Sequence, residues 1–333
     1  MNDREQLILN AIIKHYLEFG ESVGSRTLEK KYDIGVSSAT IRNTMADLED
    51  KGLIVKIHTS SGRIPTSEAY KLYIDELVKI RDVSTEAKAK IFEAYNKKMN
   101  QIDMIFEETT RLLSVMTEYA AVVLEPSIRQ EGVKKVKLVH ISDTNILAVV
   151  VMDSHLTKNL NIYLENPISE EEVENVNIYL NEKIKSSSRI FTLSDLKEFF
   201  VNTELFESDD FQDDGEKIFF EGGSKLLENN ISDIVKVIDR MKFFNNPKGM
   251  KQIFSQFLRT EEYKDGEVNI IFGEDLDIAG LEDFSFVFSV YTMGDSKGIM
   301  GVIGPKRMEY SKTVGLVEYV SEEVQQILKR NKE

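Results

Sequence analysis

Residues 37–52 read SSATIRNTMADLEDKG and decide the fold of the N-terminal segment. The two serines at the start of this stretch are suitable N-caps for a helix, and the glycine at its end closes the helix. Ile41, Met45 and Leu48 recur at helical spacing, so they are expected to form the buried side. The small and polar residues of the first turns are therefore left on the exposed side.

Two shorter helices are expected before this one, and two strands after it. Residues 3–18 carry apolar residues at helical spacing, and residues 25–32 form a second short helix. Residues 53–58 are rich in β-branched residues and therefore strand-like, and residues 63–66 return after a polar turn. Because Pro65 cannot donate a hydrogen bond to a ladder, the returning strand is short and lies at an edge. Three helices followed by two strands are typical of a winged helix-turn-helix.

The exposed start of the third helix has the chemistry of a DNA reader. Arg42 can bond a guanine edge in bidentate fashion, Asn43 can bond an adenine edge, and Thr40 can touch a thymine methyl. The wing adds basic side chains and small hydroxyl residues that suit phosphates. A plain amphipathic helix with a polar outside is the alternative, and a structural hydrogen bonder is the alternative for His58. The candidate DNA-binding residues, all of them polar or basic, are Ser25, Arg26, Ser37, Ser38, Thr40, Arg42, Asn43, Lys56, His58, Thr59, Ser60, Ser61, Arg63 and Thr66.

Charge is divided unevenly along the 333 residues, whose formal net charge is -15. Residues 1–81 hold twelve basic and twelve acidic residues and are neutral, whereas residues 165–233 hold 18 acidic residues against 6 basic ones. The neutral segment 1–81 can approach DNA, whereas the acidic remainder of the chain is repelled by the phosphates. The acidic stretch is either a partner surface or a device for solubility.

Composition excludes several classes of protein and site. The chain has no Cys, which excludes a disulfide scaffold, a Cys-ligated zinc site and a thiol nucleophile, and it fits a reducing compartment. No apolar run is long enough to span a membrane, and the N-terminus does not resemble a signal peptide. The four histidines are scattered without the paired spacing of a metal site. We therefore expect no metal, no cofactor and no catalytic residues.

The remaining chain alternates between helical and strand-like patterns. Residues 84–118 predict one long helix with a nearly heptad seam, either a dimerising helix or one that packs on its own chain. Strand-like segments between 119 and 164 and between 268 and 304 flank a mostly helical stretch, in which one helix is expected over 216–229. This order predicts an α/β domain with a helical insert.

Several strings resemble the heat-inducible transcription repressors of the HrcA family, and together they run from the N-terminus nearly to the end. Ser22 and Ala69 depart from the family, which has Pro and Gly there; both positions are structural. The matching strings are GSRTLEK (24–30), SATIRNTMADLEDKGL (38–53), HTSSGRIPT (58–66), YKLYID (70–75), IFFEGGSKLLE (218–228), VNIIFGE (268–274) and GIMGVIGPKRMEY (298–310).

The resemblance implies a cytoplasmic bacterial repressor, associated with the nucleoid when it is bound to its operator. It implies a homodimer that binds double-stranded operator DNA at an inverted repeat, the CIRCE element of chaperone operons, and that the GroEL chaperonin keeps active. The DNA-binding roles carry over to the SATIRN and HTSSGRIPT residues as they stand here.

The expected fold class is therefore α+β multidomain: an N-terminal winged helix-turn-helix, a GAF-like α/β domain and a mostly helical inserted dimerisation domain. The expected bounds are 1–81 for the winged helix, 82–118 for a linker or long helix, 119–167 with 259–333 for the GAF-like domain, and 168–258 for the inserted dimerising domain.

Two other functions remain open on the sequence. One is a small-molecule-gated winged-helix regulator, in which the GAF-like domain is the sensor and its strands enclose a pocket. The other is an enzyme whose winged helix is an accessory.

Overall fold

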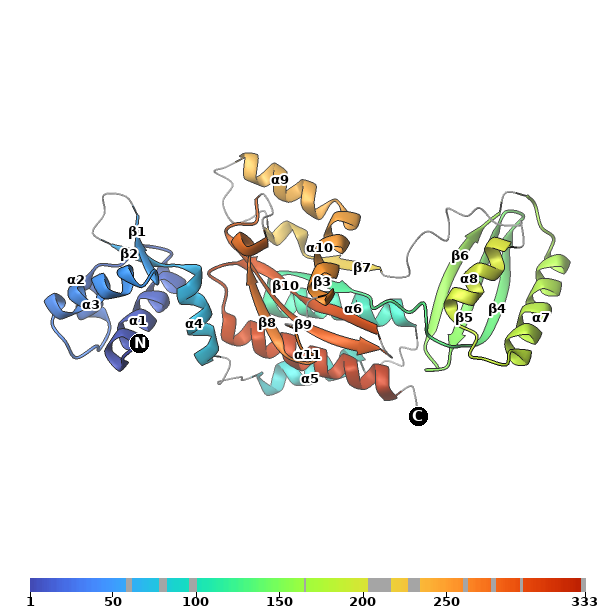
Figure 1. Cartoon of the computed structure of the whole chain (residues 1–333), viewed down its shortest axis with the longest axis horizontal. Helices are drawn as coiled ribbons and strands as arrows, with labels where there is room; N and C mark the ends of the chain where they lie inside the picture. Colours follow the sequence, from blue (N-terminus) through green and yellow to red (C-terminus); the bar gives the residue numbers. More distant parts are fainter. Residues whose placement is uncertain are drawn as a thin grey trace. The chain divides into compact units, whose positions relative to one another are not determined.

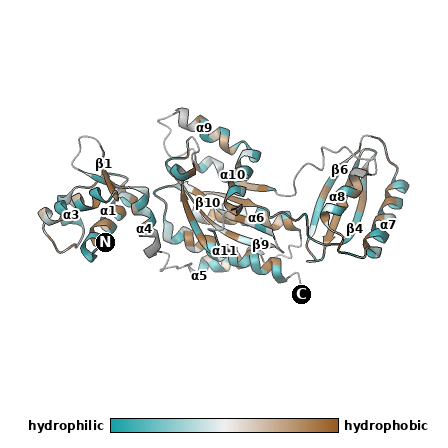
Figure 2. Cartoon of the chain, viewed as in Figure 1, coloured by the Kyte–Doolittle hydropathy of each residue, from teal (hydrophilic) through white to brown (hydrophobic). Residues whose placement is uncertain are grey.

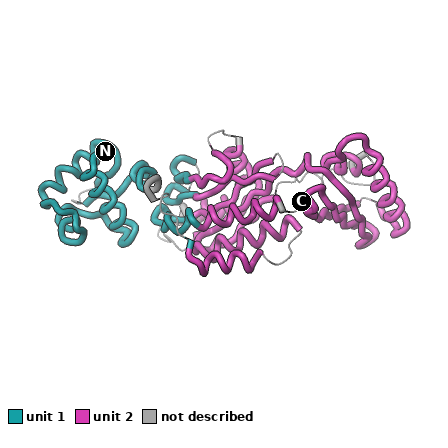
Figure 3. Tube along the Cα trace, turned by 90° about the horizontal axis from the view of Figure 1, so that it is seen from below, with its two compact units in different colours: residues 1–83, 270–286, 304–315 teal, residues 84–269, 287–303, 316–333 magenta. Residues whose placement is uncertain are grey.

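The structure, a computed structural model, describes residues 1–57, 62–77, 83–95, 101–164, 166–202, 217–226, 234–259, 263–276, 280–293 and 296–330. It is a mixed α/β protein whose chain divides into two compact units (Figure 3). The first unit comprises residues 1–83, 270–286 and 304–315, and the second comprises the rest. No helix in the described part of the chain is long and apolar enough to cross a membrane.

The N-terminal part of the first unit, which we call the head, has three helices, two strands and a further helix (Figure 1). Asn2 and Glu5 form a capping box at the start of the first helix, and Gly20 ends that helix with a φ of 69°, a left-handed conformation that glycine adopts without strain. Ile12, Leu28 and Leu48 are among the fully buried core residues. The elements are α1 (Asp3–Phe19), α2 (Ser25–Lys31), α3 (Ser38–Asp50), β1 (Ile54–Lys56), β2 (Arg63–Pro65) and α4 (Ser67–Leu77).

The single long helix expected over 84–118 is wrong, because the structure has two helices there, α5 (Thr85–Tyr95) and α6 (Ile102–Thr117). Gln101, the residue before α6, has an extended backbone, so α6 begins as a separate helix. Tyr95 Oη lies 2.6 Å from Thr109 Oγ1, so α5 folds back against α6. The apolar seam is buried within the chain, which is the second of the two alternatives drawn from its spacing.

A five-stranded sheet, most of whose strand residues belong to the second unit, runs in the order β7-β3-β10-β9-β8. Figure 2 shows that its strands are largely hydrophobic, and nearly every residue of β3, β9 and β10 is buried. Its strands are β3 (Ala120–Leu124), β7 (Ile218–Glu221), β8 (Val268–Phe272), β9 (Phe284–Met293) and β10 (Ser296–Pro305). The helices that accompany them are α9 (Ile234–Phe244), α10 (Pro247–Arg259) and α11 (Tyr310–Arg330), with short 3-10 turns at η1 (Gly223–Leu226) and η2 (Gly273–Leu276).

The helix expected over 216–229 is also wrong. β7 occupies its first part and pairs antiparallel with β3, with Val122 opposite Phe220. The free edge of β3 supplies backbone hydrogen-bond partners that local helical spacing does not reveal. Gly222, with a φ of 78°, ends the strand.

A second, three-stranded sheet of order β4-β5-β6 lies in the segment that follows β3. Its strands are β4 (Val133–Ser142), β5 (Asn145–Met152) and β6 (Thr157–Tyr163), and α7 (Glu170–Ser186) and α8 (Leu193–Asn202) accompany it. The sequence predicts one domain that contains both these strands and those at 268–304. That prediction is wrong as regards the sheet, because the two groups of strands form separate sheets. Short turns join β4, β5 and β6, so each strand pairs with its neighbour in the chain. We call residues 133–202 the insert; it differs from the mostly helical insert expected over 168–258, because it contains three strands and because β7 belongs to the five-stranded sheet.

The edge of β4 is closed by two asparagines of α7. Asn177 Oδ1 accepts a hydrogen bond from the Leu138 N–H at 3.0 Å. Asn181 both accepts from the Val136 N–H at 3.1 Å and donates to the Val136 carbonyl at 2.7 Å. These side-chain amides satisfy backbone groups of β4 that an exposed strand edge would leave unpaired.

A buried ion cluster joins the insert to the five-stranded sheet within the second unit. Lys158 of β6 is 2% exposed, and its Nζ lies 2.6 and 2.8 Å from the two carboxylate oxygens of the fully buried Glu125. Lys158 also contacts Asp103 at 2.9 Å, and Lys217 contacts Asp103 at 2.7 Å. Burial raises the pKa of Glu125 and the Lys158 ammonium opposes that shift.

Candidate nucleic-acid interface

The start of α3 is the centre of the candidate interface. Ser37 caps the helix, and its Oγ accepts a hydrogen bond from the Thr40 N–H at 3.3 Å and lies 3.0 Å from Thr40 Oγ1. Ile41 and Met45 are buried on the inner side of the helix, so Arg42 and Asn43 are exposed on its outer side. The structure therefore gives α3 the exposed polar turns that the sequence predicts.

The beginnings of α2 and α3 are joined by hydrogen bonds between predicted site residues. Ser38 Oγ donates to Ser25 Oγ at 3.1 Å, and Ser25 is buried. The Ser38 N–H lies in the first turn of α3 and so has no partner within the helix. It donates to Glu29 Oε1 at 3.0 Å. A phosphate at this helix end would therefore compete with the Glu29 carboxylate.

Three basic side chains among the predicted site residues face solvent without an acidic partner. Arg26 on α2, Arg42 on α3 and Lys56 on β1 are exposed. Within the described part of the chain, no carboxylate lies within ion-pair distance of any of them. Their positive charges are therefore available to an anionic partner.

The two strands expected for a wing form a two-stranded ladder that is extended by one further residue. β1 and β2 pair antiparallel, with Val55 opposite Ile64. Val23, which lies between α1 and α2, exchanges backbone hydrogen bonds of 2.9 and 3.0 Å with Arg63. The predicted residues His58, Thr59, Ser60 and Ser61 lie outside the described residues.

Two predicted wing residues have structural partners. The Arg63 guanidinium donates to Glu49 Oε2 through Nε at 3.0 Å and through an Nη at 2.7 Å, and its side chain is 12% exposed. Thr66 Oγ1 is shared between the carbonyls of Gly52 and Leu53, at 2.8 and 3.1 Å. These side chains fix β2 to the end of α3.

The two glutamates that receive these contacts were missed by sequence reasoning. Glu29 sits three residues after Arg26 and Glu49 sits one turn after Met45, and both look like ordinary solvated helix residues in the sequence. Their partners come from other elements, nine and 14 residues away. No local spacing signals such pairs.

Buried histidine chemistry in the head is structural. His15 Nδ1 lies 3.1 Å from Tyr32 Oη, and burial lowers the pKa of His15, with the Lys31 charge adding to that shift. Among the described residues, no group of three His, Cys, Asp or Glu side chains could hold a metal ion.

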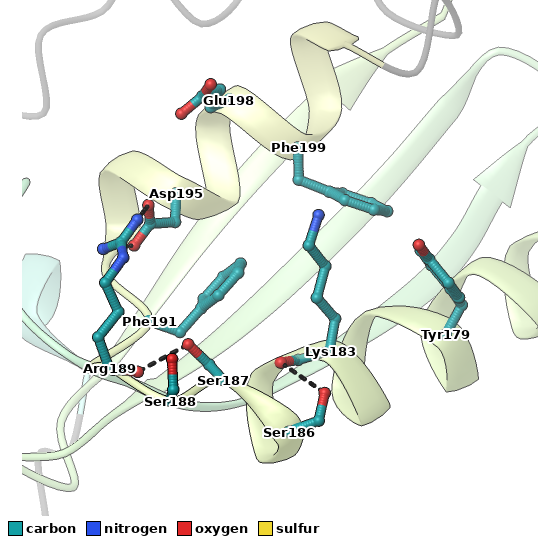
Figure 4. Close-up of a pocket in the computed structure, with 10 residues that line it drawn as sticks. All are labelled: Tyr179, Lys183, Ser186, Ser187, Ser188, Arg189, Phe191, Asp195, Glu198 and Phe199. Atoms are coloured by element: carbon teal, nitrogen blue, oxygen red, sulfur yellow. Dashed lines mark hydrogen bonds and ion pairs between the residues drawn. The ribbon is translucent and has the colours of Figure 1, made fainter.

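A cavity of about 640 Å³ lies in the insert between α7 and α8 (Figure 4). Phe199 and Tyr179 line it with ring centroids 6.0 Å apart, and Lys183 Nζ lies 5.2 Å from the Phe199 ring centre. Arg189 on its rim is paired with Asp195 at 2.6 Å. This cavity is not enclosed by the strands that the ligand-gated alternative invoked.

Comparison with known proteins gives a consistent result. The family model of the HrcA protein C-terminal domain matches residues 103–314, more than half of the chain. The heat-inducible transcription repressor HrcA of Fusobacterium nucleatum subsp. nucleatum is 43% identical over 331 residues, which cover 98% of this chain and 93% of that protein. The protein of the same description from Ruminiclostridium cellulolyticum is 32% identical over 349 residues, covering 99% and 98%.

One solved structure is similar over the whole length. It is described as a hypothetical protein, covers 99% of both chains and has a TM-score of 0.70 at 22% sequence identity. At that identity the likeness concerns the fold alone.

Proposed function

Because the chain belongs to the HrcA family of heat-inducible transcription repressors, we propose that it represses heat-shock genes by binding an inverted-repeat operator of the CIRCE type as a homodimer. The family is one of transcription repressors, and the chain is not an enzyme. The order of three helices and a two-stranded ladder supports a winged helix for the head. A GAF-like fold for the part around the five-stranded sheet is proposed from the family resemblance.

The observation that carries the proposal is the exposure of Arg42 and Asn43 near the start of α3. Arg42 and Asn43 stand on the first turns of a helix whose other side is buried in the head. A recognition helix contacts base edges with its N-terminal residues, and Arg and Asn are the side chains that read guanine and adenine there. Arg26 and Lys56 are free to contact phosphates beside it.

The remaining predicted residues divide by the contacts they make. We propose that Ser37, Ser38 and Thr40 contribute through the backbone and hydroxyls at the helix start, as Ser25 does by holding Ser38. Arg63 and Thr66 contribute by fixing the wing strand, since their donors are engaged inside the head. The loop residues of the wing, 58–61, are proposed as phosphate contacts on their chemistry alone.

The open face of the three-stranded sheet supports the homodimer. Val139, Leu147 and Val149 lie on one side of the ladder, on the side opposite the buried residues Leu138 and Ala148. Val139 is 38% exposed, and the exposed Ile141 and Tyr163 extend the apolar surface. Lys137 and Asn161 lie on the same side, so the face mixes apolar and polar side chains, as association surfaces do. A two-fold dimer would meet two half-sites of an inverted repeat.

We further propose that the GroEL chaperonin favours the binding-competent population and that heat lowers it. The family resemblance supports this regulation, and a cytoplasmic, operator-bound repressor follows from the same reasoning.

The test is binding of the full chain to a labelled duplex that carries the inverted repeat, followed by fluorescence anisotropy. The expected result is binding at least about 10³-fold tighter than to a scrambled duplex of equal length and composition at the same salt concentration. Equal affinity for both duplexes would overturn the proposal. Repeating the titration at rising temperature, with and without GroEL, tests the regulation separately, because the chaperonin should extend binding to higher temperature.

A further inference from the structure

Three segments that lie far apart in the sequence meet at α4 within the first unit. Ser67 at the start of α4 donates to Glu274 Oε2 of η2 at 2.7 Å. Lys306, which follows β10, contacts the same carboxylate and lies 3.3 Å from Ser67 Oγ. Glu274 thus receives one donor from the head and one from the C-terminal segment.

A second ion pair and an aromatic cluster extend this contact along α4. Lys71 Nζ lies 3.4 Å from Asp275. The Tyr70 ring, which is 1% exposed, lies between Phe272 and Tyr310, with centroid distances of 6.1 and 6.0 Å. The contact is therefore apolar at its centre and ionic at its rim.

The first helix of the head reaches the same C-terminal segment. The Arg307 guanidinium carbon lies 5.9 Å from the centre of the Tyr16 ring of α1. The guanidinium also lies against Gly20, where a Cβ would collide with it. Lys306 therefore contacts α4, the last helix of the head, and Arg307 contacts α1, the first.

The buried hydroxyl of Tyr70 destabilises this packing. It has no hydrogen-bond partner among the described residues. Water would satisfy the hydroxyl if α4 moved away, so the buried hydroxyl weakens the closed arrangement. The ionic contacts at the rim act in the opposite direction.

We propose that these contacts form a clamp that fixes the orientation of the head and thereby sets the half-site spacing that a dimer can bind. The clamp consists of Ser67, Tyr70, Lys71, Phe272, Glu274, Asp275, Lys306, Arg307 and Tyr310. Only Thr66 separates α4 from β2, so an α4 that is held in place also holds the wing. Glu274 and Lys306 are positioning residues, since they act on DNA binding through α4. The inference rests on the proposed operator binding.

The test compares three duplexes with full-length protein: the inverted repeat at its natural spacing, the same repeat with its spacer lengthened or shortened, and a single half-site. Glu274→Gln and Lys306→Met are expected to weaken binding at the natural spacing by about tenfold, because a loosely held second head has a lower effective concentration at its half-site. They should also flatten the dependence on spacer length and leave half-site affinity unchanged. The charge-exchanged double variant E274K/K306E should recover the spacing preference.

Tyr70→Phe supplies a change of the opposite sign. It removes the unsatisfied hydroxyl and keeps the ring, so the spacing preference should sharpen. Lys297→Met, which breaks an exposed ion pair with Asp265 outside the proposed dimer surface, is the matched control and should change none of the three affinities.

Three outcomes separate the possibilities. If wild-type protein shows no preference for the inverted repeat, the proposed function fails. If wild-type protein shows that preference and Glu274→Gln keeps the same spacing profile, the clamp is overturned. A loss of half-site affinity equal to the loss on the full repeat would also overturn it, since that pattern marks a general defect in the head.

Discussion

Replacement of Lys158 by Met should destabilise the second unit severely. The ammonium of Lys158 provides two contacts of 2.6 and 2.8 Å to Glu125, which is fully buried, and one of 2.9 Å to Asp103. Without it, the Glu125 carboxylate keeps, among the described residues, only the Lys217 backbone N–H at 3.1 Å. Removing one partner of a buried pair costs about 3–5 kcal/mol, because the other charge stays buried without compensation.

Urea unfolding followed by far-ultraviolet circular dichroism measures this loss, from the shift of the midpoint at constant slope. The double variant Lys158→Met with Glu125→Gln should regain most of it, since Asp103 keeps its pair with Lys217 and no fully buried charge is left unpaired. The loss in the single variant should also shrink as the pH is lowered, because burial raises the pKa of Glu125 and a protonated carboxyl no longer needs the cation.

An exposed ion pair in the same unit is the control. Lys137 and Glu174 are 2.9 Å apart, but both side chains are 53% exposed. Lys137→Met should therefore cost about 0–1 kcal/mol. The reasoning is refuted if Lys158→Met costs no more than Lys137→Met, since burial would then have no bearing on these pairs.

Three further predictions concern the head. Arg42→Ala should weaken operator binding by about 1–3 kcal/mol in an anisotropy titration, whereas Arg111→Ala, which removes an exposed arginine from α6, should leave it unchanged; equal losses would mean that only total charge matters. Arg63→Ala and Glu49→Gln should lower the melting temperature of the protein by similar amounts, because each breaks the same pair, and a loss of DNA affinity without a loss of stability would instead put Arg63 on the DNA. Burial lowers the pKa of His15, so the unfolded state binds the proton more strongly and the stability of the protein should fall as the pH drops below about 6.5. In thermal melts across this pH range, His15→Gln should remove that dependence. An unchanged slope of melting temperature against pH would contradict the assignment.

The sequence predicts most of the head because its signals there are local. Ser37 marks the start of α3, and Ile41, Met45 and Leu48 mark its buried side, so short-range spacing fixes this helix. The exposed position of Arg42 follows from the same spacing.

The sequence fails where partners are distant. β7 is a strand because β3 offers it an edge about 100 residues away in the chain, and nothing near Phe220 signals that edge. The break between α5 and α6 depends on tertiary contacts such as Tyr95 with Thr109. The sheets were grouped wrongly for a related reason, since alternation identifies a strand but not its neighbours.

The candidate site shows the same division. Exposure of Arg26 and Lys56 could be expected from composition, but the engagement of Arg63 by Glu49 and of the Ser38 N–H by Glu29 depends on how helices and strands pack together. The wing arginine looks free in the sequence and is paired in the fold.

The central claim is that α3 of each of two heads reads one half of an inverted repeat. A hydroxyl-radical footprint of the full chain on that duplex tests it most directly, with the Arg42→Ala variant alongside. The account predicts two symmetric protected segments, one for each half-site and related by the two-fold axis of the repeat, both weakened by the substitution. A single protected segment, or one of uniform strength along the duplex that Arg42→Ala leaves unchanged, would contradict it.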